Sequence, residues 1–173
     1  MSAPWGELGV PGHINTGAEW EAFLDAVGDP PRAQLRANAT QSIANSGPFV
    51  GVTWHASIVD SHVGWSATTT PSRYVCRVAG TYLLLGKVGW AANATGQRAS
   101  QWLVNGTAVD SSQVGHPAVA AVERQFPAAS MLVELSVNDF VELGVFQDSG
   151  GSLNLSATNA QVSSFMTIRW WCL

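Results

Sequence analysis

Over most of the chain after residue 32, apolar residues alternate with polar ones or form short β-branched runs. Gly, Pro, Asn, Asp and Ser interrupt these runs roughly every 8–12 residues, which is the spacing expected of a sandwich or barrel. The pattern predicts about ten antiparallel strands and an all-β fold, because no later segment keeps a helical period. The predicted strands are residues 33–37, 49–59, 72–78, 80–91, 99–104, 119–126, 131–137, 140–147, 153–157 and 163–172.

Three of the breaks between strands have distinctive sequences. Asn105-Gly106 is the strongest short signal for a two-residue hairpin. Asn138-Asp139 predicts a second tight turn, and residues 148–152 predict a flexible loop.

The predicted strand 80–91 is apolar on both of its faces. Tyr82, Leu84, Val88 and Trp90 share one face, and residues 83, 85, 87 and 89 share the other. A strand of this kind is expected to be buried on both sides, by a second sheet on one side and by a neighbouring subunit on the other. The closing strand is also rich in aromatic residues. The candidates for the core or a trimer contact are Tyr82, Leu84, Val88, Trp90, Trp170 and Trp171.

The first 31 residues have a different character from the rest. Residues 1–15 are rich in Gly and Pro, which predicts an extended arm. A short helix is predicted over about residues 16–28, with Thr16 and Glu19 as a capping box and a stop at residues 28–31. So short a helix needs a surface to pack on, either its own domain or a partner. We favour a partner, with residues 1–31 as a docking arm and residues 32–173 as the β domain. The predicted docking residues are Trp5, Ile14, Trp20, Phe23, Leu24 and Val27.

Charge and hydropathy exclude several functions. Charged residues make up 12% of the chain, about half the usual share, and this scarcity favours subunit contact. The net charge is −4 and the 8 basic residues are scattered along the sequence, so no nucleic-acid partner is expected. No apolar run is long enough to insert into a membrane. The first residues lack the features of a secretory signal, so we expect folding in a cytoplasm.

Few residues point to catalysis or to a bound cofactor. His55, Asp60 and His62 lie close in sequence, but we interpret them as structural because a metal site needs three or four fixed ligands. Cys76 and Cys172 are expected to be buried thiols in a reducing compartment. There is no Gly-x-Ser-x-Gly elbow and no phosphate-binding Gly-rich loop with Lys. We therefore predict no enzyme activity, no cofactor and no metal.

Five segments resemble, in order, the jelly-roll domains of the complement-component-one-q and tumour-necrosis-factor superfamily. The first is residues 71–84, with its Ala79-Gly80-Thr81-Tyr82 corner. The others are residues 88–98, 103–107, 135–143 and 164–168. The resemblance covers residues 33–173 and implies a jelly-roll sandwich that forms a homotrimer. It also implies that the final strand pairs with the strand holding Cys76, which would bring Cys172 near it.

Residues 12–33 resemble the head segment that precedes such jelly rolls in virion proteins of actinobacterial tailed phages. That resemblance implies a virion surface component, a minor tail protein or a capsid decoration, assembled in the bacterial host. Residues 1–31 would then bind other virion proteins. Residues 60–65 depart from the sequence usual in these relatives, which puts any site in that loop in doubt.

Three functions follow for the chain. The first is a trimeric virion structural protein. The second is a module that binds glycan or protein on the host surface through loops 60–71, 110–117 or 147–152, which the sequence does not rank. The third, which is the least favoured, is an enzyme such as a hydrolase of cell-wall polysaccharide.

Overall fold

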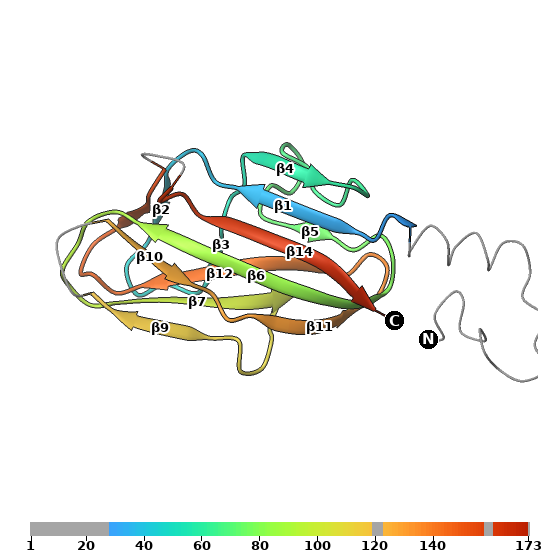
Figure 1. Ribbon diagram of the computed structural model, residues 1–173. Helices are drawn as coiled ribbons and strands as arrows, with labels where there is room; N and C mark the ends of the chain where they lie inside the picture. The colour runs from blue at the N-terminus through green and yellow to red at the C-terminus, as the bar shows by residue number, and fades with distance from the viewer. Residues whose placement is uncertain (1–27, 119–122, 158–160, 173) are drawn as a thin grey trace, which may run out of the picture.

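The protein is described by a computed structural model for residues 28–118, 123–157 and 161–172, with only the backbone of Cys172. Two antiparallel sheets pack face to face, which confirms the predicted all-β jelly roll (Figure 1). Sheet A contains β1 (Arg32–Arg36), β2 (Gln41–Ile43), β4 (Ala56–Asp60), β6 (Gly80–Trp90), β10 (Arg124–Pro127), β11 (Met131–Leu135), β13 (Leu153–Leu155) and β14 (Phe165–Cys172). Sheet B contains β3 (Val50–Gly51), β5 (Tyr74–Val75), β7 (Gln97–Val104), β8 (Thr107–Ala108), β9 (Val114–Pro117) and β12 (Phe140–Gln147).

The hydrophobic core lies between the two sheets. Alternate residues of β6 and β14 in sheet A, and residues of β12 in sheet B, point inward and are fully buried. The largest fully buried side chains of the described chain are Trp54, Trp90 and Trp102. Most of the described tryptophans therefore belong to the core or pack against it, rather than lying on the surface.

The predicted strand 49–59 is two strands that belong to different sheets. β3 pairs with β12 of sheet B, whereas β4 pairs with β1 of sheet A. Between them the chain crosses the core, where Val52 donates to the carbonyl of Leu143 in sheet B and His55 donates to that of Arg36 in sheet A. The alternation of apolar and polar residues continues through the crossing, so the sequence pattern merged the two strands.

Both predicted tight turns are present. Asn105 and Gly106 have positive φ angles of 53° and 78°, and they join β7 to β8 in a two-residue hairpin. Asn138, with φ 73°, turns the chain from β11 in sheet A to β12 in sheet B. The second turn therefore links the two sheets.

The expected partner of the final strand was wrong. β14 lies between β1 and β6, whereas β5, within the predicted strand 72–78, pairs with β12 of the other sheet. The chain leaves sheet B after Cys76 and enters sheet A at Gly80, so the two halves of the 71–84 segment belong to different sheets. The backbone of Cys172 lies opposite Thr81. Cys76 has a free, buried thiol, and its backbone bonds to Asn138 and Asp139.

The two ends of the sandwich differ in the strand ends and loops that lie there. At the end that we call proximal, the described chain enters β1 and β14 finishes (Figure 1). At the opposite end, which we call distal, lie the loops that follow β6 and β12. The predicted helix, except Gly28, and all six predicted docking residues lie outside the described residues.

Candidate functional surfaces

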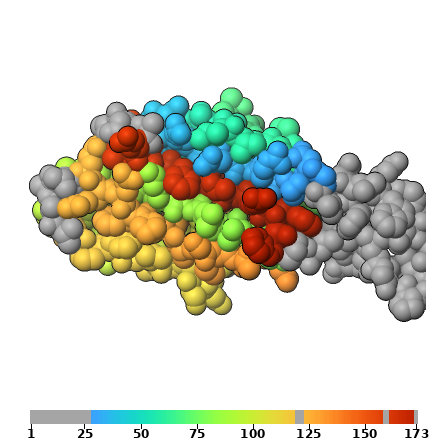
Figure 2. Space-filling view, viewed as in Figure 1, coloured from blue at the N-terminus to red at the C-terminus, as the bar shows by residue number. Residues whose placement is uncertain are grey.

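The side of sheet A that faces away from sheet B is the first candidate surface, and we call it the outer face. Its side chains follow from strand register, because directly opposed residues lie on the same face. They include Arg32, Gln34, Arg36, Leu83, Leu85, Lys87, Leu132, Phe165, Thr167 and Arg169. Figure 2 views the molecule from this side, with β1, β14, β6 and β11 side by side.

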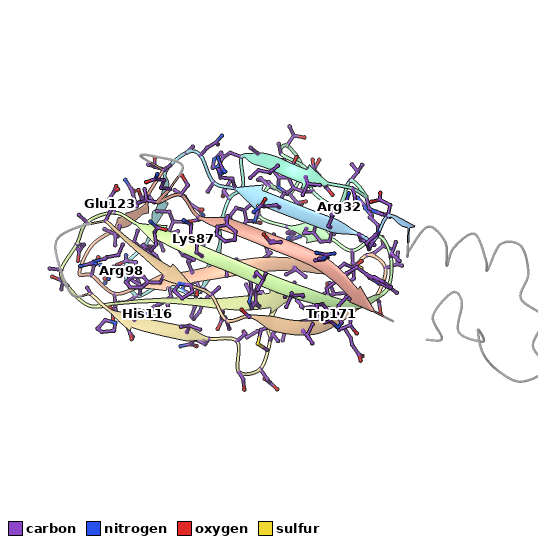
Figure 3. All side chains as sticks on the ribbon, viewed as in Figure 1. Arg32, Lys87, Arg98, His116, Glu123 and Trp171 are labelled. Carbon is purple, nitrogen blue, oxygen red and sulfur yellow. The ribbon has the colours of Figure 1, made fainter. Side chains whose placement is uncertain are left out.

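The outer face holds apolar side chains that the chain itself does not cover. Leu83, Leu85 and Phe165 are half-buried at the centre of the sheet. Leu132, opposite Leu83, is 56% exposed. Trp171 lies in a bulge at the end of β14 and is 60% exposed (Figure 3). The surface offers a partner both aliphatic and aromatic contacts.

Basic residues that are scattered in the sequence gather on this same face. Arg32 lies directly opposite Arg169, while Arg36 and Lys87 flank Phe165 on either side. Lys87 Nζ donates to Gln125 Oε1 at 2.6 Å. Burial, and then the charge of Arg36, lower the pKa of Lys87. The sheet thus assembles a basic surface that sequence inspection missed, because the grouping exists only in the register.

The six candidate core or trimer residues divide clearly. Tyr82, Leu84, Val88 and Trp90 are at most 2% exposed and face sheet B, so they form the core and offer no surface to a partner. Trp170 is half-buried and donates from Nε1 to the carbonyl of Ala79. Trp171 belongs to the surface. The expected burial of β6 on both sides is complete on the inner side only, since Leu83, Leu85 and Lys87 stay half-exposed.

The hydroxyl of Tyr82 and the thiol of Cys76 form a buried pair. Tyr82 Oη and Cys76 Sγ both donate to the carbonyl of Val78, and Sγ lies 3.6 Å from Tyr82 Oη. Burial raises the pKa of the Cys76 thiol and of Tyr82. A buried, protonated thiol is a poor nucleophile, so this pair is structural.

Asp60 organises the loop after β4. Its two carboxylate oxygens accept from the backbone N–H of Gly64 at 3.0 Å and of Trp65 at 2.9 Å. His62 contacts Ser61 through Nδ1 at 2.8 Å. Across residues 28–118, 123–157 and 161–172, no three His, Cys, Asp or Glu side chains are placed to hold a metal ion. Asp60 and His62 take part in hydrogen bonds of this loop, whereas the backbone N–H of His55 donates to the carbonyl of Arg36.

The three candidate binding loops lie at different places on the sandwich. Loop 60–71 starts at the proximal end, where Ser61 donates to the carbonyl of Arg32. Loop 110–117 runs beside β7 on sheet B. Loop 147–152 lies at the distal end, which loop 110–117 also reaches at Pro117, opposite Gln97 (Figure 1).

Hydrogen bonds join loop 147–152 to neighbouring segments, while the flexibility of residues 148–152 stays a prediction. Gln147 Nε2 donates to the carbonyls of Ile43 at 2.9 Å and Gly151 at 2.8 Å. The N–H of Gly150 donates to Asn45 Oδ1 at 2.7 Å. Asp148 accepts from the N–H of Gln97, which joins this loop to the start of β7. The distal loops thus form one hydrogen-bonded surface.

Solved structures resemble this arrangement throughout the sandwich. The globular domain of the zebrafish complement 1qA protein superposes with a TM-score of 0.60 at 12% identity, covering 83% of this chain and 99% of that one. Murine APRIL gives 0.59 at 12% identity, covering 80% and 98%. Eiger TNF from S. frugiperda gives 0.55 at 11% identity, covering 82% and 94%.

The fold is that of the C1q and TNF jelly rolls. At these identities the likeness carries the fold alone. No protein-family model matches the chain, and no curated protein matches it. Among the described residues of this jelly roll, no helix is long and apolar enough to cross a membrane.

Proposed function

We propose that this chain is a non-enzymatic structural module that forms a homotrimer through the outer face of sheet A. The carrying observation is the half-buried apolar centre of that face, together with the exposed side chains of Leu132 and Trp171. Contiguous apolar surface of this kind marks interaction sites, and aromatic residues are enriched in the cores of interfaces.

The charges of the outer face restrict how copies meet on it. The outer face carries four basic residues, which are Arg32, Arg36, Lys87 and Arg169. The described strands of this face carry one acid, Glu134 of β11. Packing two such faces flat against each other would bring like charges together and cost free energy. We infer that the apolar centre is covered by a neighbour's edge or end, with the basic residues left at the rim where water screens them.

Within that proposal, the trimer is a surface component of a bacteriophage virion, either a minor tail protein or a capsid decoration. The support is the resemblance of residues 12–33 to the head segment of such proteins. Residues 1–31 would attach it to other virion proteins. Because the described chain enters at the proximal end, that end would face the particle and the distal loops would face outward.

Binding to the host surface is the second candidate function, and it is compatible with the first. It is favoured by the distal loops, which Gln147, Asn45 and Asp148 hold in one arrangement. Loops positioned by a rigid β scaffold often carry recognition. A hydrolase has less support. Glu142, for example, is engaged by Ser72 Oγ at 2.6 Å and by Arg73 at 3.4 Å rather than facing a second acid.

Removal of residues 1–31 tests the proposed attachment. We expect the shortened chain to stay folded and trimeric, because the outer face is intact, and to be absent from purified particles. Its mass in solution and its content in particles, compared with the full chain, give the answer. Normal incorporation would exclude docking through residues 1–31, and loss of the trimer would place self-association in that segment.

A further inference from the structure

A small depression opens at the distal end, between β6, β7 and β10. Its cavity volume is about 10 Å³, which is room for about one water molecule. Its walls are Trp90, Ala91, Asn93, Arg98, Ala118, Arg124 and Phe126. The lining includes two arginines and no acid, so the depression is a cationic pocket. Figure 3 labels Arg98 at this end of the molecule.

Arg98 is a buried cation whose hydrogen-bond partners are all neutral. Only 2% of its surface is exposed. Nη1 donates to the carbonyls of Thr95 at 3.0 Å and Gln97 at 2.9 Å, and Nη2 donates to Asn93 Oδ1 at 3.0 Å. Within the described residues, no ion pair forms on it and no acceptor contacts Nε. Burial lowers its pKa, although the charge of Asp148 opposes that effect.

Arg124 adds a second guanidinium whose donors are free. It lies opposite Trp90 in the pairing of β10 with β6, and it is exposed. In the described part of the chain, no hydrogen bond or ion pair engages its side chain. By contrast, Arg32 pairs with Asp29 and Arg73 pairs with Glu142. Neither arginine of the pocket has an acidic partner among the described residues, and the pocket places the two at one site.

A histidine beside the pocket is a further polar residue that lacks a side-chain hydrogen-bond partner at one ring nitrogen. The His116 ring stacks on Phe126, a pocket wall, with ring centroids 4.4 Å apart. Its Nε2 is buried and has no hydrogen-bond partner. Buried cations and buried polar atoms without partners are costly, which favours a ligand that supplies the missing negative charge.

We propose that this pocket binds the carboxylate of an acidic sugar at the distal end of the module. A planar guanidinium pairs bidentately with a carboxylate, and the free fork of Arg124 together with Arg98 Nε offers such donors. The Asn93 amide is suited to a sugar hydroxyl, and the ring of Phe126 to the apolar face of a pyranose. The pocket admits only a group of about the size of a water molecule, so a carboxylate oxygen would enter it while the sugar ring stays outside, against Phe126. This assignment does not depend on trimer formation or on the virion role.

The experiment is a binding titration of the full chain with glucuronate, in which ligand-observed NMR detects binding. Glucose and glycerol phosphate serve as the neutral and the phosphate probes. We expect glucuronate to bind and glucose not to bind. Equal binding of glucose and glucuronate would overturn the proposal, and tighter binding of glycerol phosphate would overturn the carboxylate assignment.

Two variants locate the site. Arg124→Gln is exposed and should keep the fold, and we expect it to weaken glucuronate binding about tenfold, the loss typical of one charged hydrogen-bonded pair. Ala118→Phe should fill the pocket and block binding. Arg77→Gln, an exposed arginine outside the pocket lining, is the matched control and should bind as the unaltered chain does. Unchanged binding by Arg124→Gln would overturn the proposal.

Discussion

The two faces of β6 are similarly apolar in sequence but differ strongly in burial. On the inner face, Tyr82, Leu84 and Val88 are at most 1% exposed between the two sheets. On the outer face, Leu83 and Leu85 are equally apolar, yet they remain half-exposed beside Lys87. A single chain therefore buries the inner face of this strand completely and leaves its outer face partly exposed.

That difference separates folding from assembly. The inner face buries side chains against sheet B and accounts for the stability of the sandwich. The outer face contributes little to the fold of one chain, and its apolar centre becomes useful only when a partner covers it. The predictions below follow from this division.

The largest expected effect is on the inner face. Leu84→Ala should lower the free energy of unfolding by about 3 kcal/mol, because it leaves a cavity in a packed core. Leu83→Ala should cost under about 1 kcal/mol in dilute solution, where chains are separate. Denaturant unfolding measures both variants, and equal losses would contradict the division between the faces.

A smaller effect is expected on the outer face, and it concerns association. Leu132→Arg should weaken self-association about tenfold or more, because it places another charge where a partner would need apolar contact. The control is Val50→Arg, at an exposed apolar position on sheet B. Sedimentation over a range of protein concentrations compares them. If Val50→Arg weakens association as much as Leu132→Arg, the contact lies elsewhere.

The smallest expected effect is a pH dependence from Lys87. Its pKa is lowered in the folded chain, chiefly by burial and then by Arg36. The unfolded chain therefore binds more protons between the lowered pKa and the ordinary lysine pKa, so stability should rise with pH across that alkaline window. Lys87→Met should remove this rise. Denaturant unfolding across the window tests it, and identical pH profiles for the two proteins would exclude Lys87 as the source.

The sequence pattern predicted the long strands well and the short ones poorly. β12 and nearly all of β6 match the predicted ranges, because long runs with clear turn residues at their ends leave few alternatives. β2, β8 and β9 were missed, since two to four residues carry no measurable period. The crossing at residues 52–55 was invisible because Val52 and Trp54 continue the alternation of apolar and polar residues while the chain changes sheets.

The surfaces were harder to predict than the fold. Arg32 and Arg169 stand at opposite ends of the β domain in sequence, and only the pairing of β1 with β14 makes them neighbours. Arg98 and Arg124 likewise are far apart in sequence, and only the fold makes them line the same pocket. The strand pattern made Leu84 a candidate for the core or for a trimer contact, and its full burial assigns it to the core. Strand register, which depends on the whole fold, decides which apolar and basic residues share a face.

The most direct test of self-association is the mass of the purified full chain in solution, measured by light scattering. A trimeric outer face predicts a mass three times that of one chain, reduced toward a single chain in Leu132→Arg. A single-chain mass at every accessible concentration would contradict the trimer and leave the outer face of sheet A without its proposed role.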